Sequence, residues 1–202
     1  MTGVQTCALP IFGAIVLPMF AFAFVFAEDL VTLVYTAAYL DAAPVMRVYI
    51  IGVAALVIEL SGIMMLMRQA VFVMGVNVLG LLLAVALSWS GAVHIGLAGA
   101  AMGGVVVIYL DRIATLLRIA RLTGVRIRQL QDWRTLALLA LFAGLAASLA
   151  WVVAARAFPA SGTLLPLLIG GATLASAYVA MVAGSGMGRI WLAAALSPRP
   201  GT

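Results

Sequence analysis

Long apolar stretches, separated by charged and turn residues, dominate this chain. They cover residues 12–27, 44–67, 70–89, 91–110, 136–153 and 164–183. A helix needs roughly 20 mainly apolar residues to cross the hydrocarbon core of a bilayer, because each residue advances it by only about 1.5 Å. The pattern therefore predicts an all-α polytopic membrane protein with about six transmembrane helices in one domain, residues 12–202.

The composition narrows the fold class further. Hydrophobic residues make up 66% of the chain and charged residues 8%, which is far from the balance of a soluble globular domain. In lipid, every backbone N–H and C=O group must be bonded within the protein, so only helices and closed barrels can span the bilayer. Barrel strands alternate polar and apolar residues, whereas these stretches are unbroken, so helices are favoured.

The arginine residues predict how the helices are oriented. Cytoplasmic connections of membrane proteins are enriched in Lys and Arg. The connection between the fourth and fifth stretches is therefore cytoplasmic, because it holds Arg112, Arg118, Arg121, Arg126, Arg128 and Arg134. Alternation along the chain then places Arg68 and the C-terminus in the cytoplasm, and Arg47 and Arg156 outside. The net charge of +5 is explained by topology, so we expect no nucleic-acid partner.

The same basic connection mixes arginines with apolar residues, and this pattern has two interpretations. It is typical of an amphipathic helix in the headgroup layer, with Arg118 and Arg121 near anionic lipids and Trp133 at the interface. It also fits a solvated basic loop that only sets the topology. Both interpretations stay open at this point.

Small residues predict where helices approach one another closely in lipid. Gly99 and Gly103 form a GxxxG pair in the fourth stretch, and Gly96 begins a second row of small residues there. A similar row in the sixth stretch contains Ala172, Ser176 and Ala180. Such rows let helix backbones come close together, so we expect these residues to serve in packing.

An ionisable group inside the second stretch is the most informative polar feature. Glu59 lies within it, where a charge costs about 2.5 to 3.5 kcal/mol to insert. Arg47 is on the same predicted helix but about 18 Å away along the axis, so it cannot be the partner of Glu59. An antiparallel hairpin would bring Asn77 of the next helix to a similar depth, where its amide could donate to the carboxylate. Three roles remain open for Glu59: a structural polar contact, a group that faces a wet cavity, and a proton carrier in transport.

The sequence offers no pattern typical of catalysis. His94 is the sole histidine, and no Cys, Asp or Glu stands beside it, so we predict no metal site. Phosphate-binding loops, nucleophile elbows and paired-carboxylate spacings are absent from the sequence. We therefore predict a protein that is not an enzyme, with no catalytic residue and no cofactor.

Residues 1–11, MTGVQTCALPI, resemble the translation of a sequencing-library adapter. The resemblance implies that these residues are not native and that the upstream part of the natural protein is missing. Cys7, the only cysteine, lies in this segment, so we expect no native thiol and no disulfide. The alternative is a short natural N-terminus; a secretory signal peptide fits less well, because a basic first region is lacking.

The stretch LPMFAFAFVFAEDLVTLVYTAAYLDAAPVMRV resembles a segment of the polysaccharide and oligosaccharide flippases, which belong to the multidrug/oligosaccharidyl-lipid/polysaccharide exporter superfamily. In that family a helix that contains Leu-Pro ends in Ala-Glu. An apolar turn follows, which ends in an aromatic residue, and a Tyr comes after it. The next helix then begins with Ala-Pro-Val-Leu-Arg. The matching residues here are Leu17, Pro18, Ala27, Glu28, Leu30, Tyr35, Tyr39, Ala43, Pro44, Val45 and Arg47. The similarity continues through Asn77, Leu79, Gly80, Gly96, Leu97, Gly99, Ala100 and Ala101.

Two residues depart from the family pattern. Thr36 stands where the family has a glycine after the aromatic residue, and Met46 replaces the usual leucine. The loss of the glycine bears on the shape of the turn, because threonine tolerates a positive φ poorly.

The resemblance implies the last six helices of a transporter with twelve or fourteen helices, built from two bundles that alternate between inward-open and outward-open states. It also implies a lipid-linked glycan as the cargo, moved across the bacterial inner membrane, with membrane lipids as the other partner. Two alternatives stay open. One is another transporter of the same superfamily, such as a drug exporter or a lipid II flippase. The other is a membrane enzyme that processes glycans, which would need clustered acids or histidines in its outer loops.

Overall fold

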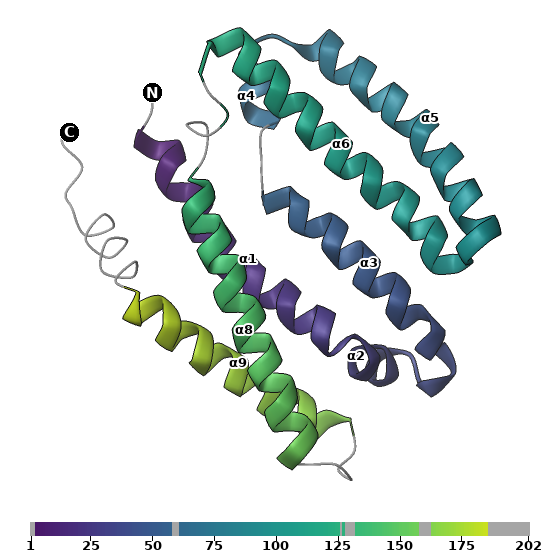
Figure 1. Cartoon of the computed structure of the whole chain (residues 1–202), viewed down its shortest axis with the longest axis vertical. Coiled ribbons are helices and arrows are strands. Elements are labelled where there is room, and N and C mark those ends of the chain that lie inside the picture. Colours follow the sequence, from purple (N-terminus) through teal and green to yellow (C-terminus); the bar gives the residue numbers. More distant parts are fainter. Residues whose placement is uncertain (1–2, 58–60, 126, 128–131, 158–162, 186–202) are drawn as a thin grey trace. The chain divides into compact units, whose positions relative to one another are not determined.

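The computed structural model describes residues 3–57, 61–125, 127, 132–157 and 163–185. The described residues form helices almost throughout, and no strand occurs among them. The chain divides into two compact units, one of Met1–Val25 with Arg134–Thr202 and the other of Phe26–Trp133 (Figure 1).

The first unit contains the helices α1 (Gly3–Val25), α8 (Trp133–Ala157, from Arg134 onward) and α9 (Leu164–Gly184). Helices α1 and α9 are in contact, and the ring of Phe22 lies against Gly171. The buried residues of α8 recur every three or four positions along one face; they are Leu139, Ala143, Ala146, Ala147, Ala150 and Ala154. This spacing is that of a helix face in close contact with its surroundings, and alanine keeps the approach short.

The second unit begins with a short helix and ends with a long helical hairpin. Its elements are α2 (Ala27–Val34), the 3₁₀ helix η1 (Ala37–Ala42), α3 (Ala43–Ala54), the 3₁₀ turn η2 (Ala55–Val57), α4 (Ser61–Leu66), α5 (Ala70–Ile95) and α6 (Leu97–Thr123). Helices α5 and α6 run side by side, and α3 packs against α6 (Figure 1).

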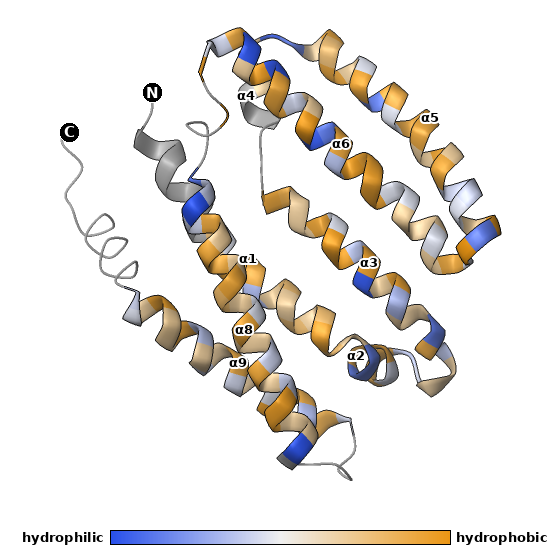
Figure 2. Cartoon of the chain, in the orientation of Figure 1, coloured by the Kyte–Doolittle hydropathy of each residue, from blue (hydrophilic) through white to orange (hydrophobic). Residues whose placement is uncertain are grey.

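The helices confirm the prediction of an all-α polytopic membrane protein. Five described segments are long and apolar enough to cross a membrane: Ala37–Val57, Ala70–Ile95, Leu97–Thr123, Trp133–Arg156 and Leu164–Gly184. The bent pair Phe12–Val25 and Ala27–Val34 raises the number to six if it counts as one span. Apolar residues colour most of the visible surface of these helices in Figure 2, as expected for helices solvated by lipid tails.

Three predicted boundaries are wrong. Residues 91–95 belong to α5, because neither Ser90 nor Gly91 interrupts the helix and the turn falls at Gly96. The predicted helix 44–67 is divided into α3, η2 and α4. The predicted connection before it contains α2 and η1. Helix α4 ends in a Schellman-type cap. The Arg68 N–H group donates to the Met65 carbonyl, and the Gln69 N–H group donates to the Met64 carbonyl.

The α5–α6 hairpin is held by a glycine seam, which we define as Gly91 of α5 with Gly99 and Gly103 of α6. A Cβ atom on Gly91 would overlap the backbone carbonyl of Gly99, and one on Gly99 would overlap that of Gly91. A Cβ atom on Gly103 would overlap the backbone of Ser88. Gly99 and Gly103 therefore lie where the backbones of α5 and α6 approach each other closely.

The other predicted packing residues behave differently. Gly96 has nothing within 4 Å of a Cβ position and a φ of 82°, so it forms the turn between α5 and α6 and does not serve in packing. In α9 the predicted row of Ala172, Ser176 and Ala180 is exposed, and the buried face contains Leu167, Leu174 and other residues. The row of small residues is therefore not a contact face among the described residues.

The glycine seam predicts that an alanine substitution destabilises the protein at one of two adjacent glycines and not at the other. Replacing Gly103 by Ala should lower the free energy of unfolding by about 1 to 3 kcal/mol, because the backbones of α5 and α6 must move apart. Replacing Gly104 by Ala should cause no loss, because open space surrounds its Cβ position. Unfolding of each variant by sodium dodecyl sulfate in mixed micelles, followed by circular dichroism, measures the difference. Equal midpoints for the two variants would contradict the seam.

Candidate functional site

Part of the resembling stretch comes together at one corner of the second unit, namely Ala27, Glu28, Ala43 and Arg47. Ala27 and Val31 of α2 are buried together with Ala43, the first residue of α3, and Met46 packs against them. Pro44 stands in the first turn of α3, where a missing N–H group costs nothing. The packing holds α2 at the N-terminal end of α3.

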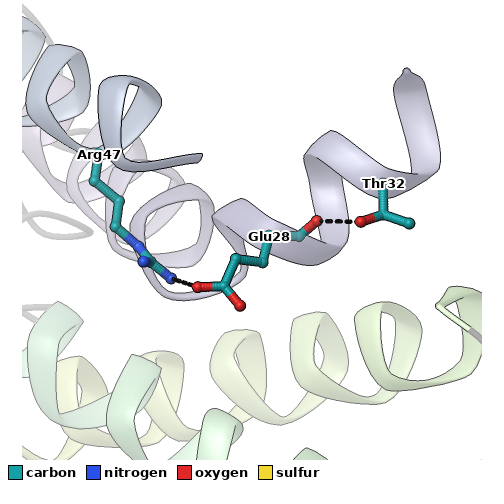
Figure 3. A network of polar contacts seen from close by, with 3 residues as sticks. All are labelled: Glu28, Thr32 and Arg47. Atoms are coloured by element: carbon teal, nitrogen blue, oxygen red, sulfur yellow. Dashed lines mark hydrogen bonds and ion pairs between the residues drawn. The ribbon is translucent and has the colours of Figure 1, made fainter. Parts of the chain in front are cut away.

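An ion pair joins the same two elements. A guanidinium nitrogen of Arg47 lies 3.1 Å from a carboxylate oxygen of Glu28 (Figure 3). The Thr32 hydroxyl donates to the backbone carbonyl of Glu28 at 2.8 Å. Both charged side chains are partly exposed, so the pair contributes no more than about 1 kcal/mol and serves mainly to set the orientation of α2 against α3. Arg47 thus has Glu28 as a partner. Glu59 lies outside the described residues, so the expectation that Arg47 does not pair with it stays a prediction.

The backbone between α2 and η1 is strained at Thr36. Its φ of 135° and ψ of 168° lie in a region that is essentially restricted to glycine. The departure noted in the sequence therefore falls at a residue whose backbone conformation requires a glycine. The side chain of Thr36 is exposed, so the strain comes from its own Cβ atom and backbone.

The α3 helix changes its hydrogen bonding near the middle of its span. The Ala55 N–H group donates to the carbonyls of Gly52 and Val53, so the chain tightens into η2. The Ile51 carbonyl, which Ala55 would bond in a regular α-helix, accepts a hydrogen bond from the Tyr109 hydroxyl at 2.9 Å. This bond joins α6 to the irregular end of α3.

The depth of this bond follows from the helical rise. Ile51 lies about 12 Å along the axis from Ala43, and Tyr109 lies about 18 Å from Leu97. Both residues therefore lie within candidate membrane spans, Ala37–Val57 and Leu97–Thr123. A carbonyl without a hydrogen bond at that depth would cost several kcal/mol, so Tyr109 makes the break in α3 tolerable in lipid.

Of the predicted pair Glu59 and Asn77, only Asn77 lies among the described residues. Glu59 lies outside the described residues. Asn77 is exposed on α5. Their proposed hydrogen bond therefore stays a prediction. Tyr109 is the only polar side chain between Gly104 and Asp111, but no pattern in the sequence marks it as the partner of Ile51.

The two arginines predicted to bind lipid, Arg118 and Arg121, differ in their surroundings. Arg118 is partly buried, donates to the Gln69 side-chain oxygen at 3.0 Å, and lies with its guanidinium carbon 5.0 Å from the centre of the Phe72 ring. Arg121 is exposed in the last turn of α6. Arg118 therefore ties α5 to α6, and Arg121 is free to contact headgroups.

For the segment up to Thr123, neither interpretation of the basic connection holds, because it is neither a separate helix nor a loop. Asp111 to Thr123 continue α6 without a break. Two apolar residues of this segment, Leu116 and Ile119, form a buried cluster with Met64. Trp133 packs against that cluster and donates its indole N–H to the Ile127 carbonyl at 3.0 Å, so it is partly buried and does not simply face the headgroups.

Among the described residues, no group of three or more His, Cys, Asp or Glu side chains could hold a metal ion. His94 is exposed in the last turn of α5. Comparisons with protein-family models, with curated proteins and with solved structures gave no match. A functional assignment therefore depends on the contact between α2 and α3 and on the contacts that α6 makes with α3 and α5.

The strained turn predicts a stabilising substitution. Replacing Thr36 by Gly should raise the free energy of unfolding by about 1 kcal/mol, because the strain at Thr36 exceeds the entropy that a glycine loses on folding. The Thr36→Ala variant is the control, because it keeps the Cβ atom and should gain little. Detergent unfolding curves measure both variants. A gain in the alanine variant as large as in the glycine variant would contradict the strain.

The two arginines predict a second contrast. Replacing Arg118 by Gln should destabilise the protein by about 1 to 2 kcal/mol, because its hydrogen bond to Gln69 and its contact with Phe72 are lost. The matched Arg121→Gln variant should change stability by no more than about 0.5 kcal/mol. Thermal unfolding in detergent separates the two, and a larger loss for Arg121→Gln would refute the assignment.

Proposed function

We propose that this chain is part of a flippase that moves lipid-linked oligosaccharide or polysaccharide precursors across the bacterial inner membrane by alternating access. The observation that carries the proposal is the convergence of the motif residues. Ala27 and Ala43 are buried in one cluster, and Glu28 and Arg47 form an ion pair. The Ala-Glu pair and the Ala-Pro-Val-Met-Arg run thus have a physical reason to occur together in one sequence.

The turn between them supports the same proposal. The family has a glycine at the position of Thr36, and the backbone there adopts a conformation typical of glycine. A chain with the flippase architecture but without that glycine would have this strain. The match between the family pattern and the backbone is independent of hydrophobic composition, which many membrane proteins share.

The membrane supplies the reason for such a protein. A large polar glycan cannot cross hydrocarbon unaided, because each of its hydroxyl groups would lose its hydrogen bonds to water. In alternating-access transporters, discontinuous helices often line the binding site near the bilayer midplane. The irregular end of α3 at Ala55–Val57 fits this pattern, and Glu59 follows it directly in the sequence. We place the proposed cavity-facing or proton-binding role of Glu59 here.

The arginine distribution supports an orientation for this part of the transporter. In the proposed topology, the α5–α6 turn at Gly96 faces the periplasm, and the end of α6 with Arg121 faces the cytoplasm. The C-terminus is then cytoplasmic. The lipid-linked glycan would be taken from the cytoplasmic leaflet, and Arg121 would lie near the headgroups of that leaflet.

Glycan export in cells tests the proposal. The uninterrupted reading frame that encodes this chain is expressed in a bacterial strain that lacks its own O-antigen flippase, and surface glycan is measured by blotting. We expect export to be restored by the full frame and not by residues 12–202 alone, since the resemblance implies a second bundle. Replacing Glu28 by Arg should reduce export, and the Glu28→Arg, Arg47→Glu double variant should recover part of it, because the ion pair is restored.

Two outcomes would contradict the proposal. Restored export by residues 12–202 alone would exclude the two-bundle architecture. A full-length protein that inserts into the membrane but leaves the glycan on the cytoplasmic leaflet would exclude the cargo. In the second case, resistance to exported drugs in the same strain would favour the other transporters of the superfamily.

A further inference from the structure

The short helix α2 has three distinct sectors around its axis. At 100° per residue, Glu28, Thr32 and Asp29 fall together on one side and form its polar sector. Ala27 and Val31 form a second sector, which is buried against Ala43 of α3. The remaining sector is apolar.

That third sector is apolar and exposed. Leu33 and Val34 keep 45% and 68% of their surface exposed, although both side chains are purely hydrocarbon. The exposed apolar surface continues beyond α2 through Tyr35, Tyr39 and Leu40. The rings of Tyr35 and Tyr39 lie 5.9 Å apart, so they present one amphipathic aromatic pair next to the apolar sector.

The free energy of this segment differs between water, the hydrocarbon core and the headgroup layer. Bulk water would leave the apolar sector and both rings unfavourably solvated. The hydrocarbon core would enclose two carboxylates within eight residues, at several kcal/mol each. The boundary between headgroups and acyl chains satisfies both sectors, and tyrosine is enriched at that depth.

The segments on either side of α2 in the sequence also favour a location at the boundary between headgroups and acyl chains. The apolar stretch of residues 12–25 precedes α2, and the candidate span Ala37–Val57 follows it. The packing of Ala27 and Val31 on Ala43 keeps α2 beside the N-terminal end of α3. Apolar segments thus lie on both sides of α2 in the sequence, as expected for a helix at the membrane boundary.

We propose that α2 and the Tyr35–Tyr39 pair form a membrane-interface anchor, with α2 lying along the periplasmic surface of the bilayer and Leu33 and Val34 inserted among the lipids. The anchor is driven by apolar burial. It has no need of anionic lipids, because its polar sector has two carboxylates, one of them paired with Arg47. This inference goes beyond the proposed function and does not depend on the cargo, so it would survive a failure of the glycan-export experiment.

Spin labels on single cysteines test the anchor in the full chain. With Cys7 replaced by Ser, labels are placed at Val34 in the apolar sector, at Thr32 in the polar sector, and at Val78, an exposed residue along α5. The protein is reconstituted in phosphatidylcholine vesicles. Electron paramagnetic resonance then gives the ratio of collisions with oxygen, which concentrates in lipid, to collisions with a water-soluble nickel complex. We expect this ratio to be lowest at Thr32, intermediate at Val34 and highest at Val78.

Three results would overturn the anchor. Equal, low ratios at Val34 and Thr32 would show that α2 is solvated by water. A ratio at Thr32 as high as at Val78 would show that α2 is inside the hydrocarbon core. An immobilised Val34 label that neither reagent reaches would show that a protein surface covers it. Addition of phosphatidylglycerol to the vesicles should leave the Val34 ratio unchanged, and a rise would refute the purely apolar mechanism.

Discussion

The need to satisfy every backbone hydrogen bond in lipid governs this structure. It favours long helices wherever the sequence is apolar, and it makes any irregular stretch at membrane depth costly. The irregular stretch Ala55–Val57, which follows α3, is accompanied by a side chain that satisfies the released group. The Tyr109 hydroxyl bonds the Ile51 carbonyl, so a break that would otherwise be expensive becomes part of the contact between α3 and α6.

The contacts between helices follow from the same solvent. Lipid tails are as apolar as leucine, so burial of large hydrophobic side chains gives little drive for association. The described α5–α6 contact depends on the absence of side chains at Gly91, Gly99 and Gly103. At the other end of the hairpin, a polar contact of Arg118 with Gln69 joins the same two helices.

Much of the fold could be predicted from the sequence, because apolar stretches in a membrane protein map directly onto helices. The packing of Gly99 and Gly103 was also predictable from their spacing. The turn at Gly96 was not, because a glycine row looks the same whether its first residue packs or takes a positive φ. The basic segment after residue 110 was misassigned because its mixed composition does not show that α6 continues.

The candidate site was less predictable because its contacts join residues distant in sequence. The bond from Tyr109 to Ile51 spans 58 positions, and no spacing rule relates the two. The resemblance identified Glu28 and Arg47 as motif residues, but only the folded chain brings their charges together. Thr36 departs from the pattern of the resembled family, and its backbone adopts a positive φ that favours glycine.

The account depends most on the chain crossing a bilayer in alternating directions, and side-specific labelling tests this directly. Single cysteines at Arg68, His94 and Val125, in a background with Cys7 replaced by Ser, are treated in whole spheroplasts with a maleimide that cannot cross membranes. The account predicts that the cysteine at His94 is labelled in intact spheroplasts, and that those at Arg68 and Val125 are labelled only after permeabilisation. Labelling of His94 and Val125 from the same side would contradict a membrane-spanning α6 and the architecture built on it.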